Sequence, residues 1–415
     1  MIRISFATLL IIIIVSASVA NAQISLTDAL KDIGVQAALR YVDEGTDATA
    51  QSLVEIGGII SPSGQEHERA RAVAERMRVI GLSNVAVDGT PNAIGIIPGR
   101  SGRALVFIAT LDDLATVAQH QKASGQPPKI EGNQVVGPGT NTSLVTAAML
   151  AAATALKKSD VVPEHDLVFA AVAQEETGLV GMKRVYETYR DRAVGFVDIL
   201  GDGRSISYGA IVIHWWRVIA EGPPGHSLGG GLPNVNQGIG RAVDRILQLP
   251  YPEKHRNQRT VINVSILNSG KVYNHKPETG WFSLDLRSLD GNIVSEMEEE
   301  VGAVLDVVSE ETQIALRMEP FHLTPGGQIP GARESALVTS AEAVSKYLGY
   351  EPRVSNMGSS NMNVAIGGGT SAIGLGGSRG GRRGFPDEWA DIPVMIRTAK
   401  HVVLLSATVG GAKTE

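Results

Sequence analysis

The chain has 415 residues, of which 43% are hydrophobic, and it carries a formal net charge of −6 and no cysteine. The lack of cysteine excludes a disulfide framework, a cysteine nucleophile and a lipid-anchored cysteine, and the acidic balance gives no reason to expect nucleic acid or an anionic membrane as a partner. A chain of this length exceeds what one hydrophobic core usually holds, so we expect two domains.

Residues 1–22 are typical of a secretory signal peptide. Arg3 precedes an apolar run from Phe6 to Val19, and Ala20-Asn21-Ala22 has the small-x-small pattern of a cleavage site. The apolar run is shorter than the roughly 20 residues of a membrane-spanning helix, and a retained anchor is the alternative. We expect the mature chain to begin near Gln23, to lie in the periplasm or outside the cell, and to have no membrane contact after cleavage.

Helix and strand patterns alternate through the first and last parts of the mature chain. Helical patterns cover residues 24–57, 65–80, 143–157, 333–347 and 392–407, and strand patterns cover residues 84–87, 93–97, 104–109, 167–173, 352–355 and 371–375. Alternation of this kind predicts a doubly wound, mostly parallel sheet with helices on both faces. We assign residues 23–206 and 322–415 to this discontinuous α/β domain.

Residues 207–321 have a different order of elements. Strand patterns at residues 210–220, 260–267, 280–287 and 313–321 enclose helical patterns at residues 236–247 and 293–310. This βαββαβ order predicts a ferredoxin-like module, inserted in the α/β domain as a lid.

A pair of carboxylates, Glu175 and Glu176, directly follows the apolar strand pattern at residues 167–173. Ligands of open α/β sheets bind outside the carboxyl ends of the strands, and adjacent side chains of an extended segment point to opposite sides. The two acids can therefore take different roles in one site. For the pair alone, a solvated loop with two acids is the alternative.

Five segments together carry a resemblance to a known family. They are SPSGQEHERA (residues 61–70), GPGTNTS (137–143), AQEETGLVG (173–181), EGPPGHSLGG (221–230) and GGRRGFPDEW (380–389). The chain thereby resembles the zinc aminoacylase, glutamate carboxypeptidase and peptidase T family of co-catalytic metallopeptidases over almost its whole mature length. The resemblance implies the same interrupted sheet domain, Glu175 as general base and Glu176 as a metal ligand.

The metal ligands that the resemblance implies are mostly missing. The family's motifs place Asp112 at the aspartate of the first ligand motif, but the other ligand positions of the pair, apart from Glu176, hold Thr110, Thr142, Leu200 and Gly384. Zinc is bound by three or four cysteine, histidine or carboxylate ligands, so we expect no co-catalytic zinc pair and no other cofactor.

A relocated divalent-metal site is the alternative, because three further aspartates lie within two residues of the lost positions. These are Asp113, Asp198 and Asp202. An all-oxygen site would favour magnesium, manganese or calcium. A one-residue offset on a strand, however, turns a side chain to the other face.

Substrate-side features match the family better. The resemblance implies that His226, in Gly225-His226-Ser227, contributes to the oxyanion hole, often across a dimer, and that Asn274 and Arg287 contact a substrate carboxylate. A turn histidine and a surface arginine without a role are the alternatives. A glycine-rich loop at residues 367–384 also carries Arg379, Arg382 and Arg383, which are suited to hold a carboxylate or to compensate the glutamate pair.

Three functions are compatible with these residues. The first is an amidohydrolase or peptidase that acts on an N-acyl amino acid or a small peptide, with Glu175 as base assisted by Asp112 and His226, and with a possible homodimer formed through the lid. Its weakness is the lost metal, which normally acidifies water and polarises the carbonyl; a lyase or isomerase would not need it. The second is a non-catalytic protein that binds such a ligand, and a purely structural role is the third.

Overall fold

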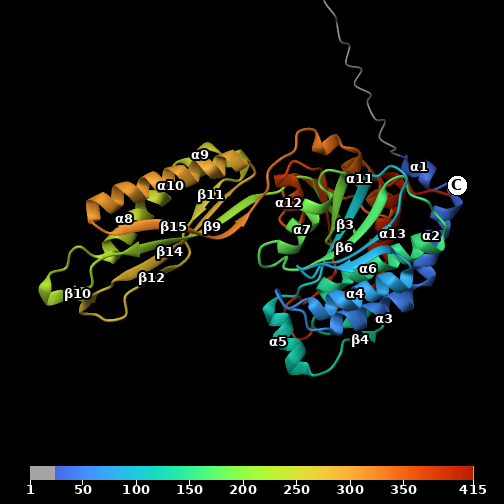
Figure 1. Ribbon diagram of the computed structural model, residues 1–415, viewed down its shortest axis with the longest axis horizontal. Helices are drawn as coiled ribbons and strands as arrows, with labels where there is room; N and C mark the ends of the chain where they lie inside the picture. Colours follow the sequence, from blue (N-terminus) through green and yellow to red (C-terminus); the bar gives the residue numbers. More distant parts are fainter. Residues whose placement is uncertain (1–23, 415) are drawn as a thin grey trace, which may run out of the picture.

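The computed structural model describes residues 24–414, so the expected signal peptide lies outside the described residues. A rounded α/β body and a narrower lid lie end to end, and the lid extends away from the body (Figure 1). Within the described part of the chain, no helix is both long and apolar enough to cross a membrane.

The body is built on an eight-stranded sheet with the order β1-β2-β6-β3-β7-β17-β8-β16. Its strands are β1 (Ser83–Val87), β2 (Ala93–Ile97), β3 (Ala104–Thr110), β6 (Asp166–Val172), β7 (Ala193–Ile199), β8 (Ser205–Ser207), β16 (Arg353–Ser355) and β17 (Ala372–Gly376). The central pairs β6–β3, β3–β7 and β7–β17 are parallel, whereas β1, β2 and the β17–β8 pair are antiparallel. The predicted doubly wound, mostly parallel sheet is confirmed.

Helices cover both faces of this sheet (Figure 1). One face packs against α2 (Ile33–Glu44), α3 (Thr46–Gly58), α4 (His67–Ile80), α6 (Thr140–Lys158), α11 (Ala336–Tyr347) and α13 (Ile392–Thr408), and the other against α7 (Val180–Tyr189) and α12 (Met362–Gly367). Every residue of β3 is buried, as expected for a central parallel strand covered on both sides. Because β3, β6 and β7 are parallel, their carboxyl ends lie together at one edge of the sheet.

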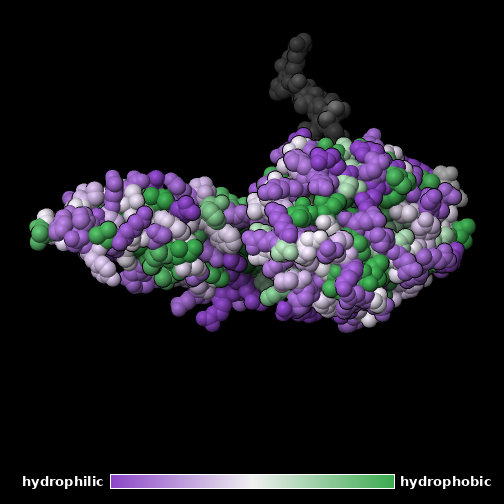
Figure 2. Space-filling view, turned by 90° about the horizontal axis from the view of Figure 1, so that it is seen from below, coloured by the Kyte–Doolittle hydropathy of each residue, from purple (hydrophilic) through white to green (hydrophobic). Residues whose placement is uncertain are grey.

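The lid is a second sheet with two helices on one face. It consists of β9 (Val212–Glu221), α8 (Val235–Leu247), β11 (Val261–Asn263), β12 (Leu267–Ser269), β14 (Thr279–Ser288), α10 (Gly291–Thr312) and β15 (Ala315–Thr324). The order β11-β14-β9-β15, with every pair antiparallel, is that of the predicted βαββαβ module. The helices leave the other sheet face open, and hydrophobic patches are visible on the lid in the view from below (Figure 2).

Two small sheets complete the fold. The strands β4 (Lys129–Glu131), β5 (Gln134–Val136), β18 (Gly380–Gly381) and β19 (Trp389–Asp391) join the segment before α6 to the glycine-rich loop. The antiparallel two-stranded sheet of β10 (Gly225–His226) and β13 (His275–Lys276) forms the far end of the lid (Figure 1). The first sheet fixes the glycine-rich loop beside the start of α6.

Two element predictions differ from the structure. The helical pattern at residues 24–57 is divided into α1 (Leu26–Ala29), α2 and α3, because Asp32 caps a new helix by accepting from the N–H groups of Gly34 and Val35. The strand pattern at residues 260–267 is interrupted between β11 and β12. There, the N–H groups of Ser265 and Ile266 donate to the Ser283 hydroxyl instead of a backbone carbonyl.

Candidate active site

The glutamate pair lies in a turn directly after β6, not in the extended segment that the sequence predicted. The buried carboxylate of Asp112 holds this turn: Oδ1 accepts from the N–H of Glu175 at 2.8 Å and Oδ2 from the N–H of Glu176 at 3.1 Å. The Ser63 hydroxyl donates to the same Oδ2 at 2.6 Å. With its lone pairs committed in this way, Asp112 positions Glu175.

Two further buried side chains support the turn. Glu66 accepts from the N–H of Gln174 at 3.0 Å, and Asn92 joins the two ends of the turn by accepting from the N–H of Ala173 and donating to the carbonyl of Gly181, each at 3.0 Å. A Cβ atom at Gly181 would lie 2.3 Å from the Asn92 side chain, so only glycine fits there. Gln174 has a φ of 56°, a left-handed conformation that non-glycine residues seldom adopt and that clusters at functional sites.

A cavity of about 300 Å³ opens at the carboxyl ends of the central strands. Its lining residues are Thr110, Thr142, Glu175, Leu200, Ser359, Ser360, Gly376, Gly377, Arg379 and Arg383. Three of them, Thr110, Thr142 and Leu200, stand at positions where the resemblance implies metal ligands. The structure thus brings these positions together around Glu175, in the place where open α/β sheets bind their ligands.

Glu175 has an unusual protonation equilibrium. Burial and, to a smaller extent, the nearby carboxylates of Glu176, Asp198 and Asp112 together raise its pKa to about 8, while Arg383 opposes the shift. A carboxyl group in a cavity with a pKa near neutral is typical of a general acid or base.

Glu176 is not among the residues that line the cavity, but it forms an ion pair with Arg383, which is. Arg382 pairs with Asp387 outside the cavity, at 3.1 Å. Arg379 lines the cavity and is half-buried, and burial lowers its pKa to about 10. The three arginines of the glycine-rich loop therefore have three different environments.

The donor set does not fit a zinc pair. Glu175 is the only carboxylate among the lining residues, and the hydroxyl groups beside it are poor zinc ligands. Gly384, at the last ligand position, donates its N–H to Glu388 at 2.9 Å. Within residues 24–414, no group of three or more histidine, aspartate or glutamate side chains is arranged to hold a metal ion.

The three aspartates of the alternative metal site are each bound elsewhere. Asp113 forms an ion pair with Arg69 at 2.7 Å. Asp198 accepts from the Ser360 hydroxyl and from a backbone N–H of α12. Asp202 accepts from the Tyr350 hydroxyl at 2.7 Å. None of the three lines the cavity, so the alternative of a relocated metal site finds no support in their positions.

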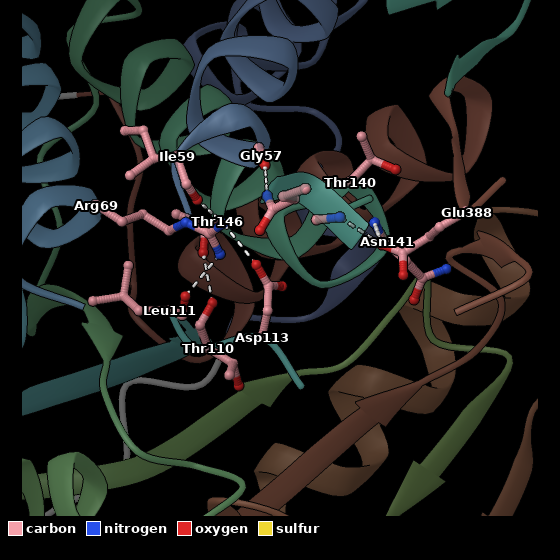
Figure 3. A network of polar contacts seen from close by, with 12 residues as sticks. Gly57, Ile59, Arg69, Thr110, Leu111, Asp113, Thr140, Asn141, Thr146 and Glu388 are labelled. Atoms are coloured by element: carbon pink, nitrogen blue, oxygen red, sulfur yellow. Dashed lines mark hydrogen bonds and ion pairs between the residues drawn. The ribbon is translucent and has the colours of Figure 1, made fainter. Parts of the chain in front are cut away.

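Two buried polar contacts fix the walls of the cavity (Figure 3). Arg69 of α4 donates to the carbonyls of Leu111 and Ile59 as well as to Asp113, which holds the segment after β3. Glu388 accepts from the N–H groups of Gly139 and Asn141 at the start of α6, at 3.1 and 3.0 Å. The glutamate thereby binds the free N–H groups of the helix end and ties α6 to the glycine-rich loop.

The lid residues lie in two other places. His226 and Asn274 are exposed and hydrogen-bonded to each other at 3.0 Å, at the two-stranded sheet of β10 and β13 at the far end of the lid, away from the body (Figure 1). Arg287 lies on the open sheet face, where it pairs with Asp285 at 2.8 Å. None of the three lines the Glu175 cavity of its own chain.

The lid does approach the glutamate turn at one point. The ring of His322 on β15 lies near Gly178 of the turn. A Cβ atom added at Gly178 would lie 3.8 Å from a ring carbon of His322. His322 in turn lies 5.4 Å from the ring of Trp215, at the start of an open-face groove lined also by Trp281 and Phe321. This contact between the domains was not predicted from the sequence.

The comparisons with known proteins decide the family. A sequence profile of Peptidase family M20/M25/M40 matches residues 116–407. The chain belongs to this family. The M20/M25/M40 profile spans the glutamate turn, the complete lid and most of α13, and a search of curated proteins found no match.

Solved structures of M20 peptidases and related proteins share the fold. The aminopeptidase PepT of Bacillus cereus is 18% identical with a TM-score of 0.73 and covers 88% of this chain and 98% of its own. A tripeptidase of Staphylococcus aureus is 17% identical with a TM-score of 0.74, with coverage of 88% and 99%. A dinuclear metal-binding peptidase of Bacillus subtilis is 13% identical with a TM-score of 0.64, with coverage of 88% and 99%.

Several site residues were missed by sequence reasoning, although some lie inside the segments that carried the resemblance. Ser63 and Glu66 belong to SPSGQEHERA, and Glu388 belongs to GGRRGFPDEW. Asn92 and Ser359 lie outside those segments and gave no pattern by which a single sequence could reveal them. Their roles depend on chain segments that are distant in the sequence.

Proposed function

We propose that this M20-family protein is an amidohydrolase or peptidase that works without the family's metal pair, with Glu175 as general base. The observation that carries this proposal is the position of Glu175, alone among carboxylates in the cavity at the strand ends and with a pKa raised to about 8. The donor set supports the loss of the metal site, because the cavity offers hydroxyl groups and arginines where zinc needs histidines and carboxylates.

In this reaction Glu175 takes a proton from the attacking water and returns it to the leaving amine. Asp112 keeps the carboxylate in place through the backbone of the turn. General acid–base catalysis contributes about 10²–10⁴-fold in rate. Since no Lewis acid adds to it, we expect slow turnover that rises as the pH approaches 8 and Glu175 loses its proton.

The substrate that fits best is an N-acyl amino acid or a small peptide. Relatives of this fold include an aminopeptidase and a tripeptidase, and a cavity of about 300 Å³ has room for one end group of such a molecule. We further propose that the protein is exported and that the lid forms a homodimer. In a single chain, His226 and Asn274 lie at the far end of the lid, so a partner subunit is the plausible route by which they reach a cavity.

A non-catalytic binding protein is the second candidate. It is favoured by the ion pair between Glu176 and Arg383, because the arginine neutralises the charge of the one carboxylate that stands at a metal-ligand position of the family. A binder has no need of a positioned base, however, whereas here Asp112, Glu66 and Asn92 all support the glutamate turn.

Turnover of N-acetyl amino acids and dipeptides by the Glu175→Gln variant tests the proposal. The amide keeps the shape of the side chain and cannot act as a base, so turnover is expected to fall by about 10²-fold or more, with ligand affinity equal or better. The exposed Glu187→Gln variant is the matched control. Unchanged turnover in Glu175→Gln overturns the assignment of the base, and the absence of turnover in the wild type, with retained binding, favours the second candidate.

A further inference from the structure

Arg379 is a cation without a salt-bridge partner among the described residues, although the carboxylates of Glu175, Glu176 and Glu388 act on it from a distance. Its two neighbours in the loop are paired, Arg382 with Asp387 and Arg383 with Glu176, whereas within residues 24–414 the Arg379 guanidinium has neither a salt bridge nor a hydrogen bond. It is nonetheless half-buried in the cavity wall. A charge removed from water without a partner is costly, so a structure that retains one provides a place for an anion.

The lining of the same cavity also carries hydroxyl groups that are free to donate. Thr110 accepts from Asn361 at 3.3 Å, which leaves its own proton free to donate. Thr142 and Ser359 also line the cavity and have no side-chain hydrogen bond within the described part of the chain. Ser360 is different, since it donates to Asp198. Three hydroxyl donors therefore face the same cavity as the free guanidinium.

We propose that this cavity is a carboxylate-binding site in which Arg379 forms the ion pair and Thr110, Thr142 and Ser359 donate hydrogen bonds. The proposal deepens the proposed function, on which it rests for the kind of ligand, by assigning the carboxylate end of an N-acyl amino acid or peptide to this cavity. A guanidinium matches the two oxygens of a carboxylate through parallel hydrogen bonds.

The charges around the cavity favour a single negative charge over two. The Arg379 guanidinium is the one arginine of the loop without a salt bridge in the described part of the chain. Two carboxyl groups, Glu175 and the buried Asp198, lie close enough together that the charge of Asp198 raises the pKa of Glu175. A dianion such as phosphate would meet these carboxyl groups with only one free cation to balance it. We therefore expect a carboxylate to bind more tightly than phosphate.

The test is a titration of the full chain, from residue 23 on, with acetate, N-acetylglycine and inorganic phosphate, followed by calorimetry and by thermal unfolding in a carboxylate-free buffer. The Arg379→Gln variant removes the free cation, and Arg382→Gln removes an arginine of the same loop that does not line the cavity. We expect saturable binding of N-acetylglycine to the wild type and to Arg382→Gln, and at least tenfold weaker binding to Arg379→Gln.

Three results would overturn the proposal: no saturable carboxylate binding, equal binding by Arg379→Gln and the wild type, or tighter binding of phosphate than of N-acetylglycine. If Arg379→Gln does not fold, Thr142→Val replaces it, since it removes one donor at nearly constant volume, and it should weaken N-acetylglycine binding severalfold. Carboxylate binding without any turnover would support the carboxylate site and refute the hydrolase. Turnover with an unchanged KM in Arg379→Gln would support the hydrolase and refute the carboxylate site.

Discussion

At the scale of single residues, Glu175 and Arg379 define the site, because each has a charge that its surroundings do not balance. Burial and neighbouring carboxyl groups raise the pKa of Glu175 to about 8, and Arg379 forms no salt bridge within the described residues, although Glu175, Glu176 and Glu388 act on it from a distance. In a metal-binding relative, a cation between the carboxylates would favour their charged form. Here the glutamate keeps its proton at neutral pH, and the arginine is left to an incoming anion.

The raised pKa of Glu175 has a consequence for stability. Between pH 4.5, the ordinary pKa of a glutamate, and pH 8, the unfolded chain has lost this proton while the folded chain still holds it, so the free energy of unfolding falls as the pH rises. Glutamine has no such proton. The Glu175→Gln variant should therefore melt close to the wild type at pH 5 and several degrees above it at pH 9.

Thermal unfolding of both proteins across this pH range measures the effect. The buried acid Asp113 cancels in the comparison, because both proteins contain it and Glu175 is not among the groups that shift its pKa. A difference in melting temperature that is constant from pH 5 to pH 9 would contradict the raised pKa.

At the scale of elements, the buried ion pair between Arg69 of α4 and Asp113 after β3 holds a wall of the cavity (Figure 3). Both side chains are almost wholly buried, with 1% and 0% exposure. Removing one partner of such a pair leaves a buried charge without compensation and typically costs about 3–5 kcal/mol. We expect that loss for Arg69→Met, and a partial recovery when Asp113→Asn is added.

Chemical unfolding of the two single variants and the double variant gives the coupling energy. Arg71→Met is the matched control, because Arg71 lies on the same helix and is exposed, so its effect should stay within about 0.5 kcal/mol. An Arg69→Met variant as stable as the control would refute the structural role of the pair.

The sequence predicted the elements well where apolar periodicity alone defines them. The central strands β3 and β6 and the terminal helix α13 lie within two residues of their predicted bounds. The strand β7, at Ala193–Ile199, was not predicted, although it lies between β3 and β17 in the sheet. Its pattern is mixed, since Gly195 and Asp198 interrupt the apolar run, and only the neighbouring strands show that it is central.

The site was less predictable than the fold, for a physical reason. Motif positions indicated that Thr110, Thr142, Leu200 and Glu175 belong together, and the cavity lining confirms that they lie around one space. The direction of each side chain depends on partners that are distant in the sequence. Asp113, for example, is next to Asp112 in the chain but turns to Arg69 in α4, which no local pattern reveals.

At the scale of the whole molecule, the elongated arrangement separates His226 from the cavity of its own chain (Figure 1). A homodimer formed through the lid would provide a histidine from the neighbouring subunit. In that case a mixture of Glu175→Gln and His226→Ala chains should recover activity that neither variant has alone, because a mixed dimer contains one complete site.

Light scattering at micromolar concentration gives the molar mass of the particle, and together with the mixing assay it tests the predicted homodimer. Glu299→Gln, a change at an exposed position of α10 that lies outside the pocket lined by Ser227 and His275, is the control for nonspecific effects on the lid. A monomer, or a His226→Ala chain with full activity, would remove the proposed dimer and leave the fold unchanged.

The central claim is that an M20 peptidase fold has kept its base and replaced its metal pair by an arginine-lined cavity. Elemental analysis of the purified, dialysed protein, combined with turnover of N-acetyl amino acids in the presence and absence of a chelator, tests it most directly. We predict no stoichiometric zinc and the same slow turnover with and without chelator. A zinc pair retained by the dialysed protein, with activity lost on chelation and restored by zinc, would contradict the claim.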